Sequence, residues 1–97
     1  MKIYIIEKAE KHSAWGTLAG PQVLCYSSDL SPLEYTDIEV CRWRITKEIE
    51  FDETGWSKIV EGARFEVNKT EGGAELKIYK NDEVVNTITY KIIEVEE

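Results

Sequence analysis

The segment from Ile38 to Phe51 constrains the fold more than any other part of this chain. From position 41 onward its apolar side chains occupy odd positions and its polar side chains even ones, with Lys47 as the exception. A period of two is typical of a β-strand with one buried and one solvated face. The pattern therefore predicts a strand over residues 38–51, with Trp43 in the core of the domain.

Five further segments have the alternation or the β-branched content of strands. They are residues 2–9, 22–27, 64–69, 74–80 and 84–95. Asn81 and Asp82 join the last two segments, and both residue types tolerate the left-handed backbone of a tight hairpin. Ile93 and Val95 fall on the opposite face from the apolar residues before them, which predicts a bulge or a second packing surface near the C-terminal end.

Two short helices are indicated. Ser31 and Glu34 have the spacing of a capping box, which predicts a helical turn that begins there. Apolar residues spaced i, i+3, i+4 and i+7 from Trp56 predict a second helix, capped by Thr54 and ended by Gly62. A loop that carries Trp56 into the core would give the same pattern.

These elements together predict an α+β fold that is mainly β, in a single compact domain of residues 1–97. We expect five or six mostly antiparallel strands, which form a twisted sheet or an open barrel with one or two short helices.

The charge of the chain excludes several classes of partner. The net charge is −7, and no run of basic residues offsets it, so direct binding to nucleic acid or to an anionic membrane surface is not expected. The apolar run at the N-terminus is too short for a signal peptide. We therefore expect a cytoplasmic protein that contacts neither nucleic acid nor membranes.

Motifs for catalysis and for metals are weak. Residues 10–21 are polar and punctuated by glycine, which predicts a long loop that holds His12 beside Ser13, an arrangement unsuited to nucleophilic catalysis. Cys25 and Cys41 lack the neighbours of a zinc site; they are either reduced buried thiols or a disulfide pair. No phosphate-binding loop occurs. The sequence thus predicts no catalytic residue, no metal site and no cofactor.

Acidic residues are concentrated in one part of the chain. Residues 29–53 hold eight acidic and three basic side chains and so contribute −5 of the net charge of −7. A surface of one sign beside a strand that carries aromatic side chains can steer association with a basic partner. The candidate partner-binding residues are Glu39, Glu48, Glu50, Asp52, Glu53 and Trp15.

Three functional hypotheses follow from these observations. The first is a small, acidic, non-enzymatic interaction protein that occupies a basic surface of a protein partner, for instance a phage or mobile-element inhibitor of a host defence or nucleic-acid-processing enzyme. The second is a small-ligand binding module that uses Trp15, Tyr26 and Trp56 to hold a nucleotide or metabolite. The third is a small enzyme that depends on carboxylates. Homodimer formation is left open in all three.

Overall fold

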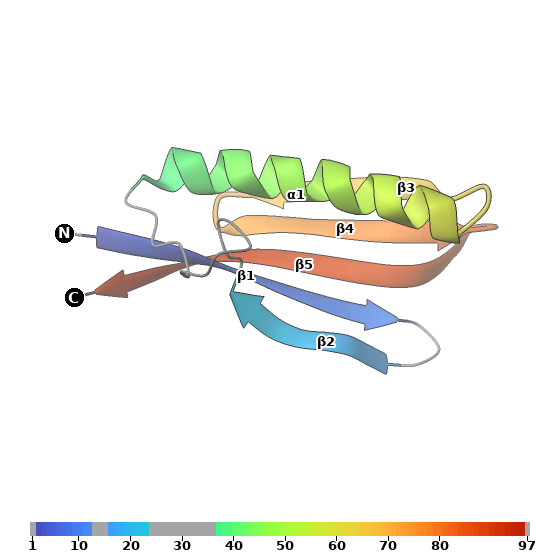
Figure 1. Ribbon diagram of the computed structural model, residues 1–97, viewed down its shortest axis with the longest axis horizontal. Helices are drawn as coiled ribbons and strands as arrows, with labels where there is room; N and C mark the ends of the chain where they lie inside the picture. The colour runs from blue at the N-terminus through green and yellow to red at the C-terminus, as the bar shows by residue number, and fades with distance from the viewer. Residues whose placement is uncertain (1, 13–15, 24–36, 97) are drawn as a thin grey trace.

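The computed structural model describes residues 2–12, 16–23 and 37–96, which form one antiparallel sheet with a helix packed on one of its faces (Figure 1). The elements are β1 (Lys2–His12), β2 (Gly16–Val23), α1 (Ile38–Ile59), β3 (Arg64–Thr70), β4 (Gly73–Lys80) and β5 (Glu83–Glu96). The strand order across the sheet is β2-β1-β5-β4-β3. The prediction of an α+β, mainly β fold is confirmed, and of the two predicted architectures the described residues form the sheet. Their helix is long, at 22 residues, where one or two short helices were predicted.

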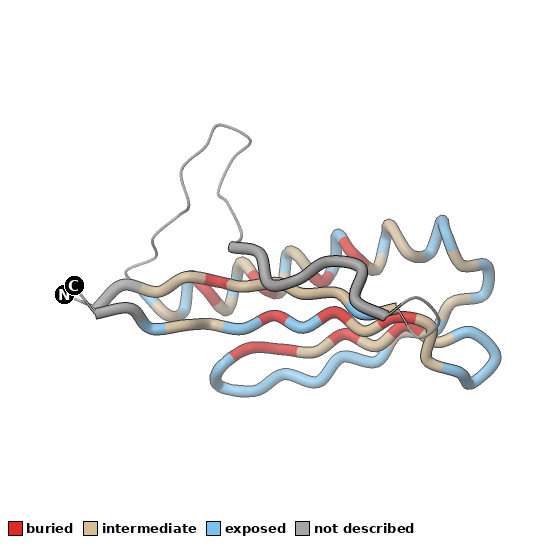
Figure 2. The backbone as a smooth tube through the Cα atoms, turned by 90° about the horizontal axis from the view of Figure 1, so that it is seen from below, coloured by how far each residue is buried: buried red, intermediate tan, exposed pale blue. Residues whose placement is uncertain are grey.

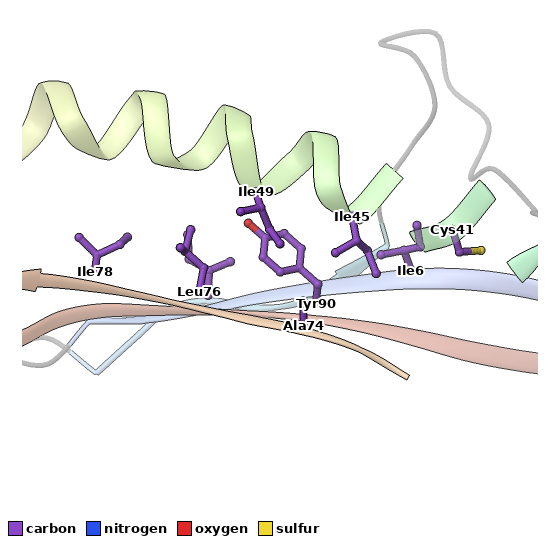
Figure 3. Packing of buried hydrophobic residues seen from close by; sticks show 9 residues of the cluster. Ile6, Cys41, Ile45, Ile49, Ala74, Leu76, Ile78 and Tyr90 are labelled. Atoms are coloured by element: carbon purple, nitrogen blue, oxygen red, sulfur yellow. The ribbon is translucent and has the colours of Figure 1, made fainter. Parts of the chain in front are cut away.

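The core lies between α1 and the three central strands (Figures 2 and 3). Alternate residues of β4 and β5 point at the helix, as the alternation of Leu76 and Ile78 predicts. The helix contributes one side chain about every turn. The buried hydrophobic residues are Ile6, Cys41, Ile45, Ile49, Ala74, Leu76, Ile78, Ile88 and Tyr90.

The strand predicted over residues 38–51 is wrong, because this segment is the first part of α1. Cys41, Ile45 and Ile49 are four residues apart, so they share a face in a helix as well as in a strand. The helix begins after Asp37, whose carboxylate accepts a hydrogen bond from the backbone N–H of Glu39 at 2.9 Å. The pattern was therefore ambiguous, and the N-cap decides it in favour of a helix.

The burial predicted for Trp43 is also wrong. In a strand, Trp43 and Phe51 would share the buried face with Ile45, but in the helix they turn outward and are 55% and 73% exposed. A step of two residues rotates a helical side chain by about 200°, which carries Trp43 to the far side from Ile45.

The second helix predicted near Trp56 is the C-terminal part of the same α1. Trp56 packs against the core, and the chain turns after the helix at Gly62, whose φ of 73° favours glycine. Thr54 is not a cap: it lies inside the helix, and its hydroxyl donates to the carbonyl of Glu50 at 2.9 Å.

The loop predicted over residues 10–21 is wrong as well. β1 continues to His12 and pairs with β2, which begins at Gly16 and ends at Val23. Predictions on Trp15, Cys25, Tyr26, Ser31 and Glu34 lie outside the described residues.

The C-terminal hairpins follow the sequence closely. Asn81 and Asp82 adopt φ angles of 51° and 65°, as expected for the tight turn between β4 and β5. The register shift in this hairpin lies between Ile78 and Tyr79, opposite Val85. Of the two alternatives predicted near Ile93, the bulge is wrong, because β5 pairs with β1 without a register shift through that region, and the second packing surface stays a prediction.

Candidate functional site

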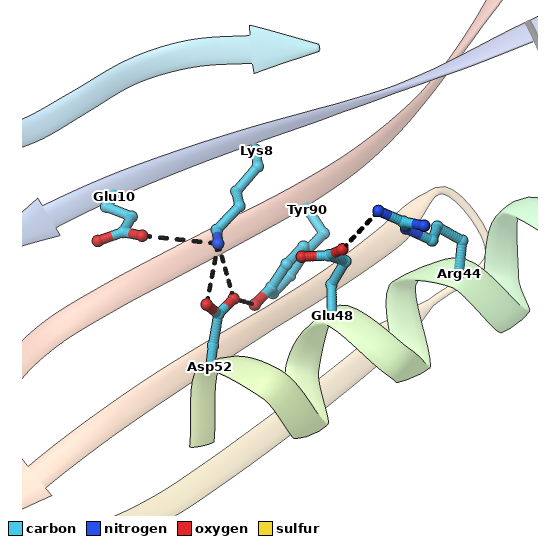
Figure 4. A network of polar contacts seen from close by, with 6 residues as sticks. All are labelled: Lys8, Glu10, Arg44, Glu48, Asp52 and Tyr90. Carbon is cyan, nitrogen blue, oxygen red and sulfur yellow. Dashed lines mark hydrogen bonds and ion pairs between the residues drawn. The ribbon is translucent and has the colours of Figure 1, made fainter. Parts of the chain in front are cut away.

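A buried carboxylate links α1 to the sheet. Asp52 comes from the helix and is 7% exposed. Nζ of Lys8, on β1, lies 2.9 Å from each carboxylate oxygen of Asp52, and the hydroxyl of Tyr90, on β5, donates to the same carboxylate (Figure 4). Because the three side chains come from three elements, this polar cluster fixes how the helix lies across the sheet.

Further charges surround the polar cluster. Nζ of Lys8 lies 3.7 Å from Glu10, and Arg44 pairs with Glu48 one helical turn away at 2.8 Å (Figure 4). Within residues 2–12, 16–23 and 37–96, no group of three His, Cys, Asp or Glu side chains is placed to hold a metal ion. The two basic and three acidic side chains gathered here are all paired with opposite charges, which is typical of a structural cluster.

Tyr90 serves this cluster as a hydrogen-bond donor. Burial raises the pKa of its phenol well above the usual value, and the hydrogen bond to Asp52 and the negative charges of Asp52, Glu48 and Glu10 raise it further. The phenol therefore keeps its proton at neutral pH and cannot act as a base.

The raised pKa of Tyr90 predicts a loss of stability in alkali. Above the ordinary phenol pKa of about 10, the unfolded chain releases this proton while the folded chain keeps it, so stability falls with rising pH by up to about 1.4 kcal/mol per pH unit. Urea unfolding of the wild type and of Tyr90→Phe between pH 8 and about 11 measures this. We expect the wild type to lose stability more steeply than Tyr90→Phe, and parallel curves would contradict the assignment.

The structure places the acidic candidate residues of α1 on two sides of the helix. Glu39 pairs with Arg42, and Glu50 lies 3.7 Å from Lys47. Glu48 forms an ion pair with Arg44, and Asp52 forms one with Lys8, as described above. Glu53 lines a hollow between α1 and β3. Glu48 and Glu50 are about 200° apart around the helix, so they do not converge as a catalytic pair.

An exposed apolar stripe on α1 was missed by the sequence analysis. Val40, Trp43 and Phe51 are 38%, 55% and 73% exposed, and with Lys47 they follow the spacing i, i+3, i+7, i+11. This spacing places them along the solvent side of the helix. We call these four residues the outer stripe. A helical reading of 38–51 would have found it, because Trp43 and Phe51 then separate from Ile45 and Ile49.

A hollow of about 370 Å³ lies between the N-terminal half of α1 and β3. It has an apolar floor of Ile45, Ala74 and Ile92. Arg42 and Lys69 line its sides together with Glu39, which pairs with Arg42. A second hollow of about 260 Å³ continues along β3 past Val67. Lys69 separates the two hollows, with its Nζ 3.3 Å from the hydroxyl of Thr46.

The remaining reactive side chains offer no site. Cys41 is a buried free cysteine, and burial, followed by the nearby charge of Asp37, raises the pKa of its thiol. His12 ends β1 and is half-buried. Among the described residues, no helix has the length and apolarity needed to cross a membrane.

Comparison with protein-family models, with curated proteins and with solved structures finds no match to this chain.

Proposed function

We propose that this chain is a non-enzymatic protein-binding protein whose partner docks on the outer stripe of α1. The observation that carries the proposal is the exposure of Trp43 and Phe51 on the solvent side of a helix whose other side is well packed. An amphipathic helix that offers a second apolar row fits the recognition mode in which a helix lies in an apolar groove of its partner.

Energetics favour these two aromatic residues as the anchors of the interface. An aromatic side chain buries about 150–250 Å² when covered, and Trp is among the residues that dominate binding energies. Val40 extends the apolar row toward the N-terminus of the helix. Glu39 and Arg42 form an ion pair beside the row, and Lys47, which lies within the outer stripe, pairs with Glu50; Glu39, Arg42 and Glu50 can form part of the polar rim that surrounds most interfaces.

The charge of the whole chain indicates the nature of the partner. With a net charge of −7, association is fastest with a basic protein surface. A defence or nucleic-acid-processing enzyme with a basic surface would be such a partner, and this chain would then act as its inhibitor. Because the acidic side chains beside the outer stripe are paired locally, long-range attraction comes from the net charge of the chain. The contact energy comes from the apolar side chains of the outer stripe.

The experiment compares three immobilised proteins: the wild type, the double variant Trp43→Ser/Phe51→Ser, and the matched control Ile59→Ser. Ile59 is 70% exposed on the same helix but outside the outer stripe. Proteins captured from a lysate of the native cells are identified by mass spectrometry, and the specific one is purified and titrated against all three. We expect the double variant to bind at least about 30-fold more weakly, the effect of losing one hot spot, and the control to bind as the wild type does.

Two results would contradict the proposal. One is a partner that binds the double variant as tightly as the wild type. The other is a partner whose affinity is lost with Ile59→Ser to the same degree, which would indicate a general loss of folding. Circular dichroism of all three proteins checks their folding before the titration.

The hollow beside β3 supports a second candidate function, the binding of a small anionic ligand. Its volume falls within the range of ligand pockets, and Lys69 could hold an anionic group beside the ring of Trp43, whereas Arg42 lines the same hollow paired with Glu39. A thermal-shift screen with nucleotides and acidic metabolites tests this. Lys69→Ala should abolish such a shift and leave protein binding intact, whereas Phe51→Ser should do the reverse.

A further inference from the structure

The two edges of the sheet differ in how they are protected against pairing with another strand. At one edge, β2 contains Gly20 and Pro21, and its pairing with β1 has two register shifts. At the other edge, β3 has neither glycine nor proline, and it pairs with β4 without a register shift over all seven residues. Proline, bulges and charged side chains all hinder strand addition; β3 has three charged residues but neither proline nor a bulge, so it is the more regular of the two edges.

The outer side of β3 is accessible. Among residues 2–12, 16–23 and 37–96, its strand partner is β4, and six of its seven residues are exposed. Its alternation places Phe65, Val67 and Lys69 on the side of the sheet that carries α1. Val67 is 39% exposed at the middle of the strand. A regular, exposed edge with a central apolar residue can accept another extended strand.

We infer that β3 pairs with β3 of a second copy of this chain, antiparallel and centred on Val67, to form a dimer with one continuous sheet. In this register Val67 lies opposite its counterpart, and Phe65 lies opposite Lys69 of the second copy. On the other face, Glu66 lies opposite Asn68 and Arg64 opposite Thr70. All seven residues are used, and no two like charges lie opposite each other.

Neighbouring registers are less favourable. A shift that centres the pairing on Glu66 places two carboxylates opposite each other, which is destabilising. A shift toward Asn68 shortens the overlap and replaces the contact between the two Val67 side chains by Val67 opposite Lys69. The sequence of β3 thus favours the Val67-centred register, in which a second copy places Val67 against Val67 and meets no like charge directly opposite.

The dimer arranges the two helices on the same side of the sheet. The two-fold axis passes between the paired Val67 residues, perpendicular to the sheet. Both α1 helices therefore lie on the same face of the continuous sheet, each over the strands of its own copy. The hollows between α1 and β3 then adjoin across the axis, and the outer stripe stays exposed on both copies. The dimer is therefore independent of the proposed docking on α1, and an experiment can contradict one proposal without contradicting the other.

Cysteine cross-linking tests the register directly. Opposed residues in antiparallel strands have Cα atoms about 4.5–5.5 Å apart, within the range that a disulfide spans. Val67→Cys should therefore form a disulfide-linked dimer under mild oxidation, and peptide mapping should locate the bond at position 67 of both chains. The matched control is Thr89→Cys, an exposed position on β5 in the interior of the sheet, which should stay monomeric on a non-reducing gel. The native cysteines are present in both variants.

Light scattering provides the second measurement. The wild type should show the mass of a dimer, and Val67→Lys, which places two ammonium groups opposite each other, should show that of a monomer with an unchanged circular dichroism spectrum. A wild type that stays monomeric, together with Val67→Cys that cross-links no faster than Thr89→Cys, would overturn the inference. A dimer that persists in Val67→Lys would overturn it too, because another surface would then hold the copies together. Binding of an unrelated peptide to β3 of a monomeric wild type is a third contradicting result.

Discussion

Asp52→Ala is expected to lower the free energy of unfolding by about 3 kcal/mol, a large share of the stability of a small domain. The substitution leaves the Lys8 ammonium beneath the helix without its main partner and removes the acceptor of the Tyr90 hydroxyl. Breaking a buried ion pair costs about 3–5 kcal/mol. We expect the lower end of that range, because the side chain of Lys8 keeps 19% exposure and has Glu10 within reach. Urea unfolding followed by circular dichroism measures the loss.

The control for this variant is Glu50→Ala on the same helix. Glu50 also has an ion-pair partner, Lys47, but their side chains are 64% and 52% exposed, so its removal should cost about 0.5 kcal/mol or less. The triple replacement Lys8→Met, Asp52→Leu and Tyr90→Phe should recover most of the loss, since apolar groups of similar volume often replace a buried ion pair without cost. If Asp52→Ala were tolerated as well as Glu50→Ala, the polar cluster would not anchor the helix.

The C-terminal half of the fold could be predicted because its signals are local. Leu76 and Ile78 alternate with polar residues in β4, and Asn81 and Asp82 form the turn that their backbone preferences favour. Each of these signals needs only neighbouring residues, so no tertiary information was required.

The helix was misassigned because two periods coincide in residues 38–51. Positions that repeat every four residues, such as Cys41, Ile45 and Ile49, satisfy both a strand and a helix. Trp43 and Phe51 also occupy odd positions, so they completed the strand pattern. In the folded protein they are apolar residues on the exposed side of the helix, which a pattern based on burial does not anticipate. The signal for a helix was present in the charges, since Arg44 and Glu48 are spaced as an ion pair on one helical face.

The polar cluster could not be predicted from the sequence. Lys8 and Asp52 are 44 positions apart, and Asp52 and Tyr90 are 38 positions apart, so no local motif connects them. The pairing within the acidic segment could not be predicted either. Its excess of carboxylates indicated a surface of one sign, whereas the folded chain pairs Glu39, Glu48 and Asp52 with basic side chains and buries the last of them.

The proposed binding surface depends on how residues 38–59 are oriented, and Ile45 and Trp43 report that orientation. Ile45 is 4% exposed and packs between helix and sheet, so Ile45→Ala should cost about 3 kcal/mol through lost burial and the cavity left behind (Figure 3). Trp43 is 55% exposed, so Trp43→Ala should cost less than about 1 kcal/mol despite removing a larger side chain.

The most direct test of this orientation is urea unfolding of Ile45→Ala and Trp43→Ala side by side with the wild type. A helix with Trp43 turned outward predicts a difference of about 2 kcal/mol or more between the two variants, with Ile45→Ala the less stable. A strand would bury both side chains on one face. Large losses of similar size in both variants would therefore contradict the helix, and with it the outer stripe as the binding surface.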